Sequence, residues 1–165
     1  MSDLAIAIEY DNWATDKVAG FCAALSPEQR ALTTPGTMGT LEATLIHLVA
    51  AKERYATALR GTPPPEDAVR ETTTKDLAQL VARGRALSKW FSAYAEGPID
   101  LDRVIERRAA DGSTQRMPTG ILIAQFLHHG NEHRAQLGSI LGANGIEPPH
   151  YSAFNWGNEL GKISS

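Results

Sequence analysis

Two histidines, His129 and His133, stand four residues apart in a segment whose apolar residues recur at helical spacing. Those apolar residues are Leu122, Phe126, Leu137 and Ile140. Side chains four apart on a helix lie one above the other on the same face, so both imidazoles can reach a single ion. The HxxxH spacing therefore indicates a metal site built on one helix.

A third histidine, His47, lies in a separate helical segment, one position away from the main apolar stripe of that segment. Its neighbours on the same flank are small: Thr44, Ala51 and Ala58. Small side chains leave room for an ion beside the imidazole. We predict that His47, His129 and His133 hold one divalent metal ion, with a coordination position left open, as is typical of catalytic sites. HxxxH without an adjacent glutamate is a weak motif, so half-buried structural histidines are the alternative interpretation.

Three polar residues near the HxxxH pair are candidates for supporting the ligands. Gln136 lies three residues after His133 on the same face and can hydrogen-bond that imidazole. Glu132 and Arg134 flank His133 and could orient ligands or carry protons, but a solvated or interhelical salt bridge is the simpler role for both.

The remaining histidines and the single cysteine give weaker signals. His128 is turned about 100° around the helix from His129, which places it outside the predicted ligand set. His150 follows two prolines and is expected at the surface. Cys22 has no basic neighbour in sequence that would activate it as a nucleophile.

Four helices are expected to position these side chains, at residues 4–25, 40–60, 74–96 and 119–141. Each carries one apolar stripe, and such stripes can be buried only against one another. Asp111-Gly112, between arginine-rich segments, predicts a tight turn in a small hairpin. The sequence therefore predicts an all-α fold, a four-helix bundle with a small β-hairpin before the fourth helix.

Capping residues mark several predicted helix ends. Ser26 and Gln29 form the pattern of a capping box around a short turn that begins at Pro27. Thr74 and Thr119 are the predicted N-caps of the third and fourth helices.

Composition limits the classes of protein to which the chain can belong. Its 165 residues are the size of one domain, so residues 1–165 are expected to form a single unit. The net charge of -3 disfavours general binding to nucleic acid or to anionic lipid. One cysteine permits no internal disulfide, and no secretory signal or membrane span is evident, so we expect a cytoplasmic protein.

Four motifs occur in a recognisable order: Tyr10-Asp11-Asn12-Trp13, Leu45-Ile46-His47-Leu48, Asp111-Gly112, and the run from His129 to Gln136. In order and spacing they resemble the DinB/YfiT-like metal-binding bundles across nearly the whole chain. The resemblance implies that His47, His129 and His133 hold a divalent ion, often zinc or nickel, and that the protein forms a homodimer. Many members read His-His-Arg-Gly-Gln where this chain reads Glu132-His133-Arg134-Ala135-Gln136, a departure that keeps the ligands but leaves the substrate open.

The resemblance also implies a class of reaction. Characterised relatives include metal-dependent S-transferases and isomerases that use low-molecular-weight thiols such as bacillithiol or mycothiol. The leading hypothesis is therefore a metal-dependent transferase in which the ion stabilises the deprotonated form of a thiol or water, with a small-molecule substrate. A non-catalytic, metal-stabilised helical dimer or binding module is the alternative, and a metal-dependent hydrolase or DNA-damage-related protein is the third.

Overall fold

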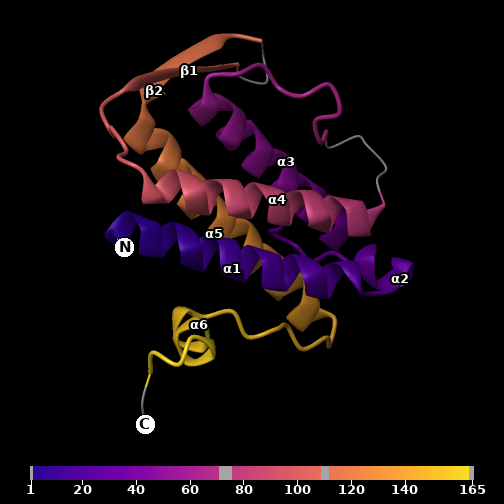
Figure 1. Ribbon diagram of the computed structural model, residues 1–165. Helices are drawn as coiled ribbons and strands as arrows, with labels where there is room; N and C mark the ends of the chain where they lie inside the picture. Colours follow the sequence, from indigo (N-terminus) through magenta and orange to yellow (C-terminus); the bar gives the residue numbers. More distant parts are fainter. Residues whose placement is uncertain (1, 71–75, 109–111, 164–165) are drawn as a thin grey trace.

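The structure is a computed structural model that describes residues 2–70, 76–108 and 112–163. In these ranges the chain is mostly helical, with six helices and one two-stranded antiparallel sheet (Figure 1). The elements are α1 (Asp3–Ala23), α2 (Pro27–Arg30), α3 (Leu41–Arg60), α4 (Leu77–Glu96), β1 (Val104–Arg108), β2 (Thr114–Pro118), α5 (Thr119–Ala143) and α6 (Ala153–Glu159). The predicted mostly helical fold with a small hairpin before the last long helix is confirmed.

The core lies between the four long helices. The α1 helix packs against α4 and α5, and α3 packs against the same two helices (Figure 1). The apolar stripe of α3 is buried, as expected, and consists of Leu41, Leu45, Leu48, Tyr55 and Leu59. Burial of such a side chain stabilises the fold by about 1.5–3 kcal/mol, so the stripes fix which face of each helix turns inward. Among the residues described, no helix combines the length and apolar character needed to cross a lipid bilayer.

Local chemistry explains where two of the helices begin and end. The capping box predicted for Ser26 and Gln29 is present, and each side chain bonds the backbone of the other residue. Thr40 caps α3 by accepting a hydrogen bond from the amide of Ala43. Gly61 ends α3 with φ +67°, a left-handed conformation that glycine adopts without steric cost.

Two predicted caps differ from the structure. The α4 helix begins at Leu77 and is capped by Asp76, whereas the predicted cap, Thr74, lies outside the described residues. Thr119 is the first residue of α5 and not its cap, because the extended Pro118 precedes the helix. The Thr119 hydroxyl instead donates to the carbonyl of Arg103 at 2.9 Å, which continues the pairing of the hairpin into the helix.

The hairpin that leads into α5 has the predicted topology. β1 and β2 are antiparallel, with Ile105 opposite Met117. Gly112 has φ +82°, as the predicted tight turn requires, while Asp111 lies outside the described residues.

Candidate metal centre

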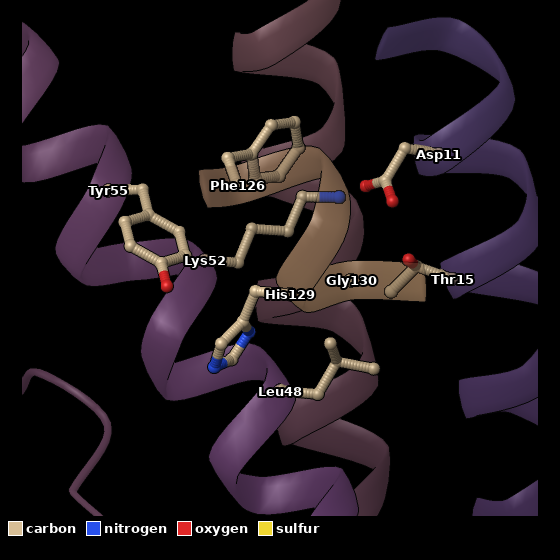
Figure 2. Close-up of a pocket in the computed structure, with 8 residues that line it drawn as sticks. All are labelled: Asp11, Thr15, Leu48, Lys52, Tyr55, Phe126, His129 and Gly130. Carbon is tan, nitrogen blue, oxygen red and sulfur yellow. The ribbon is translucent and has the colours of Figure 1, made fainter. Parts of the chain in front are cut away.

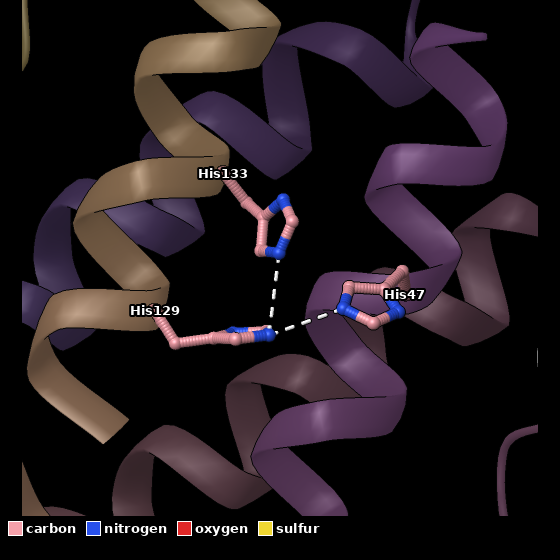
Figure 3. Close-up of side chains that lie close together, drawn as sticks. All are labelled: His47, His129 and His133. Atoms are coloured by element: carbon pink, nitrogen blue, oxygen red, sulfur yellow. Dashed lines mark hydrogen bonds between the residues drawn. The ribbon is translucent and has the colours of Figure 1, made fainter. Parts of the chain in front are cut away.

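Three imidazoles from two helices meet in the structure. His47 extends from α3, and His129 and His133 extend from α5, which packs against α3 (Figure 3). The Nε2 atom of His129 lies 3.1 Å from that of His47 and 3.2 Å from that of His133. One ring nitrogen from each residue lies within 4.8 Å of the other two. The residues that the sequence singled out therefore converge on one point.

Local sequence explains how the helices present these rings. His129 and His133 are one helical turn apart, so both project from the same face of α5 toward α3. The small neighbours of His47 on α3, namely Thr44, Ala51 and Ala58, are buried and allow α5 to approach. His133 is buried, while His47 and His129 are partly exposed, so the cluster lies at the edge of the core.

Hydrogen bonding fixes the tautomer of His133. Its Nδ1 lies 3.0 Å from Oε1 of Gln136, and because a carbonyl oxygen only accepts, Nδ1 must carry the proton. In the neutral ring the lone pair then belongs to Nε2, which faces the other two imidazoles. The structure thus contains the hydrogen bond predicted for Gln136.

His129 and His133 both favour the neutral form. Burial, followed by the proximity of His133 and His47, lowers the pKa of His129 to about 4. Burial also lowers the pKa of His133, and the hydrogen bond to Gln136 opposes this shift. Neutral imidazoles are the form that binds metals, so these two rings are prepared as ligands at neutral pH.

Hydrogen bonds among the three rings cannot satisfy all of them. Nε2 of His129 contacts two other nitrogens, but it can either donate one proton or accept one, and His133 offers only a lone pair. If Nε2 of His129 has no proton, its contact with His133 joins two lone pairs, and if it has one, that proton can point at only one of the two neighbours. A tetrahedral ion with bonds of about 2.0–2.1 Å to imidazole nitrogens separates them by about 3.3 Å, close to the two distances from Nε2 of His129 given above. The donor set therefore fits a divalent ion.

The other predicted residues lie away from the ring nitrogens. Arg134 is 1% exposed and pairs with Asp11 of α1, and it also donates to the hydroxyl of Thr15 at 2.8 Å. Arg134 therefore forms an interhelical salt bridge, which is the simpler of the two roles predicted for it, and it does not orient a histidine. Glu132 is exposed and acts on His133 only through its charge, which raises the pKa of that ring slightly against the effect of burial.

The excluded candidates also lie where the sequence analysis placed them. His128 and His150 are exposed, and neither belongs to the histidine cluster. Cys22 is buried, and burial raises the pKa of its thiol to about 12, so it remains protonated and unreactive at neutral pH.

Sequence analysis missed a buried polar network beside the histidines. Lys52 of α3 is 3% exposed, and its Nζ donates to Asn12 Oδ1 and to Ser88 Oγ, both at 2.8 Å. Ser88 in turn donates to Asp16 at 3.0 Å. A signal for Lys52 did exist, because it stands four residues after Leu48 on the inward stripe of α3, where an apolar residue is expected.

Gly130 makes room for the ion pair of Asp11 and Arg134. A Cβ at this position would lie 2.5 Å from Oδ1 of Asp11 and 2.9 Å from a terminal nitrogen of Arg134. Only glycine therefore lets the Asp11–Arg134 pair sit against α5.

A small cavity lies between the histidine cluster and the polar network, among α1, α3 and α5 (Figure 2). The space open to the centre of a water molecule is about 10 Å³, close to the minimum that one water molecule needs. Polar and apolar side chains share its lining: Asp11, Thr15, Leu48, Lys52, Tyr55, Phe126, His129 and Gly130. The ring of Tyr55 also meets that of His129 edge-on, with centroids 5.6 Å apart.

Comparison with known proteins identifies the family to which the chain belongs. The family model of the DinB family matches residues 1–158 of the 165. A comparison with curated proteins gives no match to this chain.

Proposed function

This chain belongs to the DinB family, and we propose that it is a metal-dependent enzyme whose divalent ion is held by His47, His129 and His133. The observation that carries the proposal is the convergence of three ring nitrogens within 4.8 Å of one another. Family membership supports it independently, since the match includes all three histidines.

The number of ligands favours catalysis over a purely structural role. Among the described residues, the group that could hold a metal ion contains three histidines and no fourth His, Cys, Asp or Glu. Structural sites generally use four protein ligands, whereas catalytic sites keep one position for water or substrate. The partial exposure of His47 and His129 is compatible with access to that position.

The chain's own residues prepare the site. Gln136 holds His133 in the tautomer whose Nε2 lone pair faces the cluster. Burial keeps His129 neutral. A divalent ion at such a site supplies Lewis acidity, which lowers the pKa of a thiol or a water molecule that it coordinates.

We propose further that the substrate is a small molecule and that the reaction is an S-transfer or isomerisation that uses a low-molecular-weight thiol. Zinc or nickel is the proposed ion: imidazoles suit zinc, nickel, iron and copper, and the resemblance to the family favours the first two. In this proposal the four long helices form a four-helix bundle, the whole chain is one domain, and the protein acts in the cytoplasm as a homodimer.

The test begins with protein purified without chelators or nickel resin. Elemental analysis should find about one zinc or nickel ion per chain, and the protein should conjugate a bacterial thiol to an electrophile. His47→Ala should lose both the metal and the conjugation. His128→Ala is the matched control, since it removes an exposed imidazole next to His129 and should preserve both.

Two outcomes would change the conclusion. If His47→Ala retains full conjugation, the metal mechanism is wrong. If the wild-type protein binds one ion but no thiol reacts, and chelation lowers its melting temperature strongly, the ion is a structural element of a binding module.

A further inference from the structure

His129 has a ring nitrogen for which the described residues supply no hydrogen-bond partner. Its Nε2 faces the other imidazoles, so in a ligating ring Nδ1 carries the proton. No side chain or carbonyl in the described parts of the chain accepts a hydrogen bond from this Nδ1. A ligating histidine almost always donates its second N–H to a carboxylate, a carbonyl or water. His133 uses Gln136 for this purpose, and His129 has the cavity beside it.

One N–H bond of Lys52 has no acceptor among the described residues. An ammonium group has three N–H bonds, and two of them reach Asn12 and Ser88. Within residues 2–70, 76–108 and 112–163, no atom accepts the third. Figure 2 shows the amine extending past Phe126 toward Asp11, along the wall of the cavity. A buried cation with an unused N–H at a polar cavity is a strong anchor for a neutral acceptor.

The opposite wall offers acceptors. The Asp11 carboxylate uses Oδ1 for Arg134, and its second oxygen receives no hydrogen bond from any described residue. The hydroxyl of Thr15 accepts from Arg134 and has a second lone pair. Four residues that line the cavity, His129, Lys52, Asp11 and Thr15, therefore offer two unused donors and two unused acceptors, which is the number that one water molecule satisfies with its two lone pairs and two protons.

We propose that this cavity is a site for one ordered water molecule, which accepts hydrogen bonds from His129 and Lys52 and donates to Asp11 and Thr15. The water connects His129 to the Asp11 carboxylate, and Lys52 holds it in place. Lys52 is then a positioning residue for His129. The positioning role of Lys52 rests on the proposed function, because it matters only if His129 binds a metal ion. The water site does not depend on the proposed function.

The water site can be tested on the wild-type protein directly. A crystal structure at a resolution of about 1.5 Å, without metal and with zinc, should show one water within hydrogen-bond distance of His129 Nδ1 and Lys52 Nζ. A dry cavity, or a water that contacts neither atom, would overturn the proposal.

The role of Lys52 is tested with Lys52→Met, which keeps the length of the side chain and removes its donors. Loss of a partner outside the ligand set typically weakens metal affinity about 10–100-fold. We expect a loss of this size for Lys52→Met in a cobalt(II) titration followed by absorbance, together with a shifted ligand-field spectrum and no water in the crystal structure.

Ser88→Ala is the matched control, because it breaks one bond of Lys52 at a position that does not line the cavity. It should destabilise the network but leave the cobalt affinity and spectrum unchanged. Unchanged affinity in a folded Lys52→Met, or an equal loss in Ser88→Ala, would overturn the positioning role. If Lys52→Met does not fold, the wild-type crystal structure still decides on the water. Wild-type protein that binds no cobalt would refute the proposed function and not the water site.

Discussion

Removal of Asp11 should destabilise this protein more than removal of its partner Arg134. Arg134 is 1% exposed, and Asp11 is the carboxylate with which it pairs among the described residues. Asp11→Leu therefore leaves a buried guanidinium whose remaining hydrogen bond, among the described residues, is the one to the hydroxyl of Thr15. Breaking a buried ion pair in this way costs about 3–5 kcal/mol. For a chain of this size the melting temperature should fall by roughly 10 °C.

Arg134→Met should cost less because Asp11 keeps a second cation nearby. Burial lowers the pKa of Lys52 to about 8, and the nearby charge of Asp11 opposes this shift, so Lys52 and Asp11 attract each other. We expect a loss of about 1–3 kcal/mol, the cost of leaving a buried acceptor partly unsatisfied. The double variant removes both buried charges, so it should be more stable than Asp11→Leu alone.

Urea unfolding followed by circular dichroism, with EDTA present to exclude any metal contribution, measures these differences. Arg116→Met serves as the control, since Arg116 and its partner Glu106 are 72% and 60% exposed; it should change stability by less than about 0.5 kcal/mol. A loss below about 1 kcal/mol for Asp11→Leu, or a double variant less stable than that single variant, would refute the reasoning.

Three further predictions concern pH, metal affinity and a helix end. The pKa of Lys52 is about 8 in the folded state and near 10.5 in the unfolded state, so the unfolded state binds more protons between these pH values. The free energy of unfolding should therefore rise by about 3 kcal/mol as the pH rises through this window. Lys52→Met should lack that rise in urea titrations at pH 7 and pH 10. Gln136→Leu frees His133 to adopt the other tautomer and should weaken zinc binding about 10–100-fold by calorimetry, and an unchanged affinity would contradict the role of that hydrogen bond. Gly61→Ala should lower the free energy of unfolding by about 1 kcal/mol in thermal unfolding, because φ is +67° at this position. Gly142→Ala, in α5, should not destabilise the protein, since no atom lies within 4 Å of the new Cβ.

Much of the fold could be predicted because its signals are local. The stripe of α3 and the capping box at Ser26 depend on residues within a few positions of one another, and both appear as expected. The predicted cap at Thr119 differed because the partner of its hydroxyl lies outside the helix. Thr119 bonds to Arg103 across the hairpin, a partner that the residues near the helix start do not reveal.

The shared face of His129 and His133 could be predicted from the period of the helix alone, since a spacing of four places both rings on the same side of α5. The same period explains Arg134: one residue after His133, it is turned about 100° away and meets α1. Gln136, three residues after His133, returns to the ligand face and reaches the ring.

The sequence by itself determined which residues lie on the same face of each helix and which types could bind a metal ion. Only the tertiary structure decided which faces meet, because side chains far apart in the sequence come together through packing of the whole core. It brought His47 within 3.1 Å of His129, and it placed Lys52 against Asn12 and Ser88. A lysine on an apolar stripe can be buried only where other helices supply acceptors, and the sequence of α3 does not contain them.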